Sequence, residues 1–275
     1  MKKESSGIDL SLSEISENLN TDTFGKSVVV LGEVGSTNLY AKGLLDIFDD
    51  GTLIVANTQS NGRGRLGKTF ISPYGGLYMS IVFKVGQTIN EPDFITVKTA
   101  LCVIHAIEKL TDICGLGIKW VNDIYCGDKK VCGILAERIS EKNKQDYIIL
   151  GIGVNVETKN VYFTGDAKNI ATSLSEHTDK YINKNILCAE IVNELEKYLF
   201  KKKISRKKII DEYRNRSILI NKDIYVIKGE NEIPAKVIGI DDNASLYVNY
   251  ENGTSEILRT GEVSTKLKAH ESEAK

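Results

Sequence analysis

The chain has 275 residues, of which 41% are hydrophobic and 27% are charged, so it is long enough for one large domain and a small one. Its formal net charge of −1 excludes a strong overall field toward nucleic acid or a membrane surface. The polar first residues lack the apolar segment of a secretory signal, and no apolar run reaches the roughly 18 residues of a membrane helix. We therefore expect a cytoplasmic protein with no membrane partner.

Cysteine and histidine usage argues against a metal centre. The five cysteines form no C-x-x-C pair, and the three histidines are not spaced for ligation. In a cytoplasmic protein such cysteines are expected to be reduced thiols. The composition thus predicts no metal site held by the protein alone.

The first part of the chain alternates between strand and helix patterns. Residues 1–22 are expected to form a tail or one short helix. Ser36 is a natural N-cap for the helix that follows it. The elements predicted after the tail are a strand at 27–34, a helix within 35–51, a strand at 52–59, a strand at 77–85 and an amphipathic helix within 93–115.

Two strongly apolar segments at 131–139 and 147–156 predict an antiparallel hairpin. A turn midway between them places Gly133 opposite Gly153. Paired strand glycines suggest that a ligand approaches the backbone closely, although a bulge or tight packing would also require them. The apolar neighbours expected to line this slot are Leu135 and Val154.

Beyond the hairpin the pattern changes twice. Residues 184–203 and 206–215 predict helices, and short strands at regular spacing follow from about residue 217. The predicted fold is α+β, a mixed and mainly antiparallel sheet flanked by helices, followed by a small SH3-like β-barrel. The predicted divisions are a tail at 1–22, a catalytic domain at 23–216 and the barrel domain at 217–275.

The stretch "NGRGRLGKTF" at residues 61–70 matches both G-x-G-x-x-G and G-x-x-x-x-G-K-T. Both patterns require a helix directly after the loop, and Pro73 with two following glycines excludes a useful one. Three glycines and three cations instead predict a loop that repulsion keeps disordered and that orders around an anion. The alternative is a flexible surface loop with incidental charge.

Four further motifs accompany this loop in the order "GSTN" (35–38), "KWVNDIY" (119–125), "KVCGILAE" (130–137) and "GIGVNV" (151–156). Together the five motifs resemble those of the biotin–protein ligases, over about residues 33–175, and the "TGEVS" near the end resembles that family's C-terminal domain. The resemblance implies a class II synthetase-like fold. It also implies ATP-dependent activation of biotin as biotinyl-5′-AMP, followed by transfer to a lysine of a carrier protein.

The resemblance implies a biotin site built from hydroxyl, amide and cationic groups. Ser36, Thr37 and Gln59 suit the ureido ring, which donates and accepts hydrogen bonds. Taken alone, Ser36 could be only a helix cap, and the other two only unremarkable polar residues. The implied biotin-binding residues are Ser36, Thr37, Asn38, Gln59, Gly62, Arg63, Arg65, Lys130, Gly133 and Gly153.

The resemblance also implies the residues that act on ATP. Lys130 would stand between carboxylate and α-phosphate, and Arg63 and Arg65 would close over their junction, which makes these three the expected catalytic residues. Phe70 stands where the family usually has tryptophan, and Val121 replaces a common proline. The implied ATP-binding residues are Lys68, Phe70, Asn122, Asp123 and Asn155.

The resemblance implies that magnesium accompanies ATP near Asp123; the alternative interpretation of Asp123 is a plain turn residue. The implied acceptor is the biotin carboxyl carrier protein of acetyl-CoA carboxylase or a related carboxylase. Because the motifs begin by residue 35, a winged helix-turn-helix does not fit before them, and the chain resembles the monofunctional ligases without DNA binding. A homodimer is also common in that family.

The alternative functions are a lipoate or octanoate ligase, a non-catalytic biotin-binding regulatory protein and, behind these, a phosphate-loop hydrolase.

Overall fold

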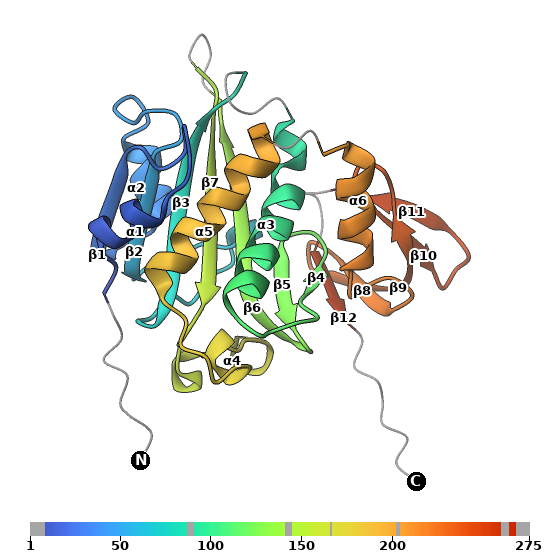
Figure 1. The fold of residues 1–275 in the computed structure, drawn as a ribbon. Coiled ribbons are helices and arrows are strands. Elements are labelled where there is room, and N and C mark those ends of the chain that lie inside the picture. The colour runs from blue at the N-terminus through green and yellow to red at the C-terminus, as the bar shows by residue number, and fades with distance from the viewer. Residues whose placement is uncertain are drawn as a thin grey trace.

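The computed structural model describes residues 9–86, 91–140, 145–165, 167–201, 204–259 and 264–267. Two sheets organise this part of the chain (Figure 1). A seven-stranded sheet is formed by strands between residues 28 and 155, and a five-stranded sheet by strands between residues 223 and 267. Among the described residues, none of the helices has the length and apolar character that a bilayer crossing requires.

The large sheet has the order β1-β2-β3-β7-β6-β5-β4. Only β1 and β2 run parallel, and every other neighbouring pair is antiparallel. The predicted mixed, mainly antiparallel sheet is therefore confirmed. Its strands are β1 (Val28–Val34), β2 (Leu53–Gln59), β3 (Gly76–Lys84), β4 (Gly117–Lys119), β5 (Asp123–Cys126), β6 (Lys129–Ile139) and β7 (Tyr147–Asn155).

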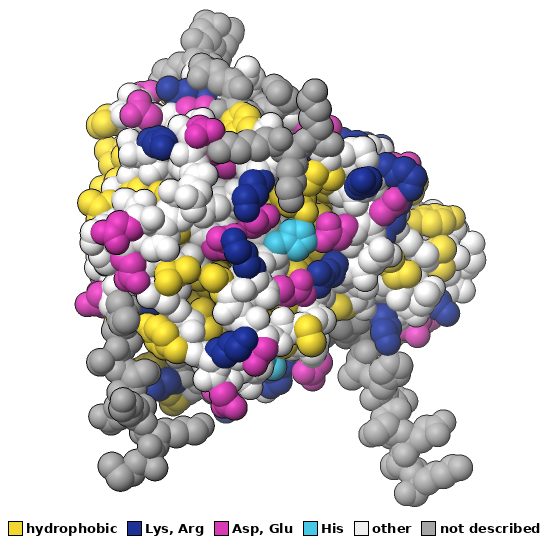
Figure 2. Space-filling model, in the orientation of Figure 1, with side chains coloured by type: hydrophobic (Ala, Val, Ile, Leu, Met, Phe, Trp, Pro, Cys, Tyr) yellow, Lys and Arg dark blue, Asp and Glu magenta, His cyan; other side chains and the backbone are white. Residues whose placement is uncertain are grey.

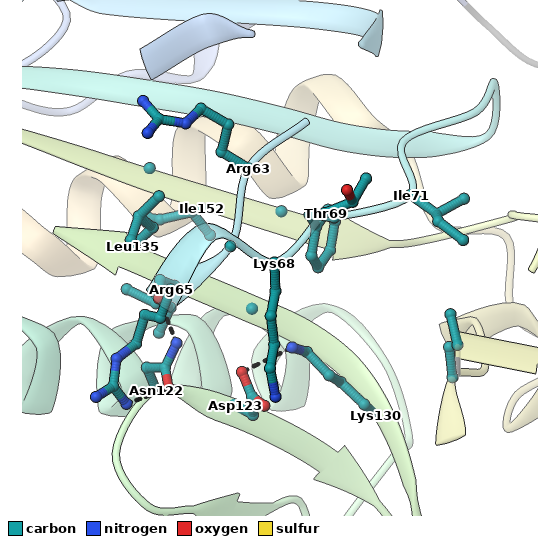
Figure 3. A pocket seen from close by; sticks show the side chains of 18 of the residues that line it. Arg63, Arg65, Lys68, Thr69, Ile71, Asn122, Asp123, Lys130, Leu135 and Ile152 are labelled. Carbon is teal, nitrogen blue, oxygen red and sulfur yellow. Dashed lines mark hydrogen bonds and ion pairs between the residues drawn. The ribbon is translucent and has the colours of Figure 1, made fainter. Parts of the chain in front are cut away.

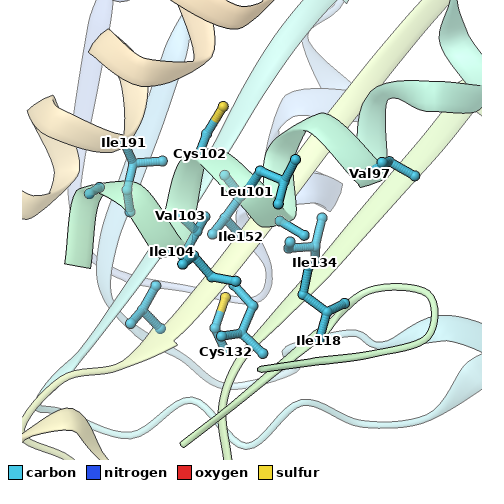
Figure 4. Close-up of a cluster of buried hydrophobic side chains, with 14 of the residues drawn as sticks. Val97, Leu101, Cys102, Val103, Ile104, Ile118, Cys132, Ile134, Ile152 and Ile191 are labelled. Carbon is cyan, nitrogen blue, oxygen red and sulfur yellow. The ribbon is translucent and has the colours of Figure 1, made fainter. Parts of the chain in front are cut away.

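One face of this sheet is covered by α1 (Leu12–Asn18), α3 (Ile95–Leu110) and α5 (Lys184–Glu196), as Figure 1 shows. Figure 4 shows Leu101 and Ile104 of α3 beside Ile134 and Ile152 of the central strands. All four side chains are buried, and full burial of such a side chain contributes about 1.5–3 kcal/mol. The outer surface of the helical layer carries interspersed basic and acidic side chains (Figure 2).

The hairpin of β6 and β7 has the predicted register, with Gly133 directly opposite Gly153. One expectation is wrong, because Val154 does not line the slot beside these glycines. Successive strand residues point to opposite faces, so Val154 is buried in the core under the helices. Leu135 lies two residues from Gly133 and does face the slot.

The helices differ from the predicted segments in length. Ser36 has extended backbone angles and caps α2 as predicted, but α2 ends at Gly43 rather than continuing toward residue 51. Glycine is a poor helix former, and three aspartates and a further glycine follow by residue 51. A π-helical turn at Lys197–Lys201 extends α5, and α6 covers Arg206–Asn215.

The second sheet has the order β11-β10-β9-β8-β12 and is antiparallel throughout. Its closure into an SH3-like barrel remains a prediction, and residues 260–263 of the "TGEVS" stretch lie outside the described residues. Its strands are β8 (Asp223–Lys228), β9 (Asn231–Ile240), β10 (Leu246–Tyr250), β11 (Ser255–Leu258) and β12 (Ser264–Leu267).

A direct hydrogen bond joins the two sheets near the site. The indole Nε1 of Trp120 donates to the carbonyl oxygen of Ala244 at 2.8 Å, and both residues are buried. Trp120 lies two residues before Asn122, one of the predicted ATP ligands. The turn between β9 and β10 therefore supports the backbone that presents this ligand.

The start of the described chain is fastened to the end of α5 by one carboxylate. Glu196 is 2% exposed and accepts hydrogen bonds from the backbone N–H groups of Asp22, Thr23 and Phe24, at 2.6, 2.9 and 2.8 Å. A carboxylate that accepts several backbone donors makes charge-assisted bonds, which are stronger than neutral ones.

Replacing Glu196 by alanine is expected to lower the free energy of unfolding by about 3 kcal/mol, because partly buried N–H groups lose their acceptor. Urea denaturation measures this change. Glu176→Ala removes an exposed carboxylate and serves as the control, with an expected change within about 0.5 kcal/mol. Equal unfolding curves for the two variants would contradict a stabilising role for the hydrogen bonds of Glu196.

Candidate active site

A cavity of about 460 Å³ opens on the sheet face opposite α3 and α5. Every predicted site residue except Gly62 lines it, although they come from segments far apart in the chain. Gly62 lies at the base of the loop, where an added Cβ would come within 2.3 Å of the carbonyl oxygen of Phe70. The backbone conformation of the loop therefore requires glycine at this position. Gly62 lies beside the cavity rather than in it.

Thr37 and Gln59 form one hydrogen-bonded corner of the cavity. The backbone N–H and the hydroxyl of Thr37 both donate to Oε1 of Gln59, at 2.9 and 3.2 Å, and Nε2 of Gln59 donates to Ser72. Ser36 accepts from the Leu39 N–H at 3.5 Å, which leaves its hydroxyl proton out of the capping bond. The cap and a ligand-binding role for Ser36 are thus compatible.

Asn38 extends this corner toward the sheet. Its Oδ1 lies 2.6 Å from the hydroxyl of Ser80, and its Nδ2 donates to Oε2 of Glu137 at 2.8 Å. The amide packs over Gly151, where an added Cβ would lie 2.4 Å from Oδ1. Any side chain at position 151 would therefore displace this amide.

The loop at 62–70 is a small folded hairpin, not the disordered segment that repulsion predicted. The Gly64 N–H donates to the carbonyl of Lys68 at 2.7 Å, and the Phe70 N–H donates to the carbonyl of Gly62 at 2.9 Å. A single 3-10 turn, Arg65–Gly67, forms its tip, and no α-helix follows, as predicted. Repulsion is relieved because Arg63 and Arg65 have separate partners, Glu137 on β6 and Asn122 in the turn between β4 and β5.

Cationic groups gather around Asp123 in the next corner (Figure 3). Nζ of Lys130 lies 2.7 Å from Oδ1 of Asp123, and Arg65 donates to Oδ1 of Asn122 at 3.3 Å. Figure 3 also shows the Lys68 side chain pointing into this group. The corner therefore has more positive than negative groups and suits a polyanion. Arg63 lies apart from it, bonded to Glu137.

Burial alters the acidity of two cations here. It lowers the pKa of Arg65, against the opposing influence of Asp123. It also lowers the pKa of Lys119, where Asp123 again opposes the shift and Lys130 adds to it. Lys119 lines the cavity, and sequence reasoning did not single it out although it opens the "KWVNDIY" motif.

The ring of Phe70 lies over the paired glycines. Cβ atoms added at Gly133 and Gly153 would come within 2.9 and 2.5 Å of its ring carbons. The ring makes an edge contact with Tyr78, and Nζ of Lys130 lies 5.5 Å from its centre. The glycines thus admit a flat group directly against the strands, which in this structure is Phe70 itself.

Asn155 ends β7 at the same cavity. Its Nδ2 donates to the carbonyl oxygen of Thr172 at 3.0 Å, whereas its buried Oδ1 has no hydrogen-bond partner among the described residues. A buried acceptor without a partner is costly, so a ligand that donates to it gains affinity.

No group of three or more metal-ligating side chains occurs within the described ranges. Asn122 and Asp123 offer oxygen ligands at the cationic corner, but both already have cationic partners. Magnesium usually keeps several waters and binds through one or two carboxylates together with substrate phosphates. The residues present fit a magnesium ion brought in with a nucleotide.

Comparisons with known proteins show which proteins this sequence and fold resemble. Residues 32–155 match the model described as "Biotin/lipoate A/B protein ligase family". The computed structure superposes on "Biotin protein ligase from Aquifex aeolicus in complex with biotin and ATP" with a TM-score of 0.75, at 29% identity, covering 88% of this chain and 100% of that one. Residues 32–155 therefore match a domain of the biotin/lipoate A/B protein ligase family, and the predicted resemblance is confirmed.

Two relatives of known name show which kind of ligase the chain resembles. The "Bifunctional ligase/repressor BirA" of Bacillus spizizenii is 34% identical over 177 residues, 64% of this chain. The chain spans about half of that relative's length, 54%. The "Biotin--[acetyl-CoA-carboxylase] ligase" of Mycobacterium tuberculosis is 26% identical over 244 residues, covering 85% of this chain and 87% of the relative. The relatives of this chain are thus biotin–protein ligases.

Proposed function

We propose that the protein is an ATP-dependent biotin–protein ligase. It joins biotin to ATP as biotinyl-5′-AMP with release of pyrophosphate, and then passes the biotinyl group to a lysine with release of AMP. The observation that carries this proposal is one cavity in which neutral hydrogen-bonding groups, a glycine-lined slot and a cationic corner adjoin. A small acid with a polar ring and a nucleotide would meet there.

In the first step a biotin carboxylate oxygen attacks the α-phosphorus, and the bond to pyrophosphate breaks. Both reactants are anionic, so fixed cations lower the barrier most where their charges meet. Lys130 has that role in our proposal, with Arg65 beside it, and Arg63 would keep the loop closed over the junction through its ion pair with Glu137 at the rim. The folded loop would keep water from the mixed anhydride. No covalent enzyme intermediate is required.

Biotin would place its ureido ring against Ser36, Thr37 and Gln59, beside Asn38. Its bicycle would lie on Gly133 and Gly153. Tight contact with two bare strands favours a compact ring system over a long flexible chain. The hydrogen-bonding corner and the glycine-lined slot together favour biotin over lipoate or octanoate.

ATP would place its phosphates in the cationic corner, near Lys68, Asn122 and Asp123, with Mg²⁺ supplying further charge neutralisation. Asn155 offers an acceptor, its buried Oδ1, to the exocyclic amine of adenine. Phe70 would stack on the adenine after leaving the glycines, with a smaller ring than the family's usual tryptophan.

The acceptor in this proposal is a lysine of the biotin carboxyl carrier protein of acetyl-CoA carboxylase or a related carboxylase. Support comes from the relative named for acetyl-CoA-carboxylase ligation. The proposal includes a cytoplasmic location and allows a homodimer formed through a sheet edge. The lysine amine attacks the acyl carbon, and AMP leaves.

Isotope exchange between pyrophosphate and ATP tests the first step separately from any carrier. We expect exchange with biotin, and at least 100-fold less with lipoate or octanoate at equal concentration. Exchange that depends on lipoate would instead support the lipoate ligase alternative. Biotin binding without any exchange would support the non-catalytic alternative.

A further inference from the structure

The rim of the cavity contains an ion pair that joins the cationic loop to the sheet. Nη1 of Arg63 lies 3.3 Å from Oε1 of Glu137 on β6, and the two side chains are 40% and 25% exposed. Figure 3 shows Arg63 directed away from Lys68 and Lys130. Glu137 itself does not line the cavity. Its contact with the loop is therefore made outside the space that a substrate would fill.

The second oxygen of Glu137 accepts from the buried amide of Asn38 at 2.8 Å. A carboxylate can only accept, so it requires the Nδ2 side of that amide to face it. Oδ1 of Asn38 then faces the hydroxyl of Ser80 at 2.6 Å. The carboxylate of Glu137 thus contacts both the loop, at Arg63, and Asn38 in the polar corner of the cavity, which Thr37, Asn38 and Gln59 form.

The other side of the loop is held independently, because Arg65 donates to Asn122 at 3.3 Å. The loop therefore has two separate attachments, one to β6 through Glu137 and one to the turn between β4 and β5 through Asn122. We propose that Glu137 is a positioning residue that latches the 62–70 loop to β6 through Arg63, while it also orients the Asn38 amide. Its effect on the reaction rests on the proposed function: a loop released at Arg63 lets the adenylate escape.

Limited trypsin digestion without ligands tests the latch directly, because the loop offers cleavage after Arg63, Arg65 and Lys68. Glu137→Gln removes the charge that holds Arg63 but keeps an oxygen for the Asn38 amide. We expect cleavage after Arg65 and Lys68, followed by mass spectrometry, to be roughly fivefold faster in this variant. The same change at the exposed Glu176 is the control and should leave the rate unaltered.

A wild-type cleavage rate in Glu137→Gln would overturn the latch. Equal acceleration at sites remote from the loop would overturn it too, because it would indicate general destabilisation. A double-mutant cycle with Arg63→Met gives the sharper test. The latch predicts the same rate after Arg65 and Lys68 in both single variants and in the double variant. Further acceleration in the double variant would show that Glu137 acts through Asn38 instead.

Release of labelled biotinyl-5′-AMP measures the consequence for the reaction. Glu137→Gln is expected to release it roughly fivefold faster than the wild type, with an unchanged rate for Glu176→Gln. Unchanged release from Glu137→Gln would overturn the role in retention. A wild type that forms no adenylate would contradict the proposed function, and the proteolysis cycle would still decide the latch.

Discussion

Replacing Lys130 by alanine is expected to lower the rate of adenylate formation by at least about 10²–10³-fold, because a fixed cation is lost where carboxylate and phosphate meet. Lys130 pairs with Asp123 at 2.7 Å, so its ammonium group is already positioned. Single-turnover formation of labelled biotinyl-5′-AMP measures the effect.

The neighbouring Lys129 supplies the matched control, because Lys129→Ala removes an equal charge one residue away, on the opposite side of β6. We expect near-normal adenylate formation in that variant and a similar melting temperature for both. A normal adenylate yield from Lys130→Ala would contradict the role assigned to this lysine. A large loss in Lys129→Ala alone would contradict it as well.

Replacing Arg65 by glycine is expected to release free biotinyl-5′-AMP at least about tenfold faster than the wild type. The guanidinium holds one flank of the loop through Asn122 and would bind the adenylate's phosphate at the same time. Filtration of enzyme-bound from free adenylate at successive times measures the release.

Glycine also loosens the backbone at the tip of the loop. Arg65→Met separates the two effects, because it removes the charge and keeps an ordinary backbone. Arg138→Gly, which removes an exposed arginine paired with Asp146 on the separate β6–β7 hairpin, is the control. Normal retention of the adenylate by both Arg65 variants would count against closure of the loop over the intermediate.

Local pattern predicted the hairpin and its register because an antiparallel pair is nearly symmetric about its turn. Gly133 and Gly153 could therefore be matched by counting from the turn alone. The cap at Ser36 was predictable for a similar reason, since capping depends on neighbours three residues away. Alternation along β7 also indicates that Val154 points to the face opposite Gly153. Its burial under the helices was therefore predictable from the sequence, and the predicted place beside the slot was wrong.

Other parts of the site depend on contacts between distant residues. Arg63 and Glu137 are 74 positions apart, and no local signal pairs them. The prediction of a disordered loop was wrong because it considered the charges of the loop without their partners elsewhere in the chain, Glu137 and Asn122. The bond between Trp120 and Ala244 spans 124 positions and joins two sheets. Lys119 could have been found from its place at the head of a motif.

The most direct test of the account is intact-mass spectrometry of a biotin carboxyl carrier domain after incubation with this protein, Mg-ATP and an equimolar mixture of biotin and lipoate. We predict a single adduct of the mass of a biotinyl group, and none when the carrier's acceptor lysine is replaced by arginine. An adduct of lipoyl mass would keep the mechanism and contradict the assignment of the polar corner. An unmodified carrier, with biotin bound to the protein, would contradict the central claim that this cavity catalyses ligation.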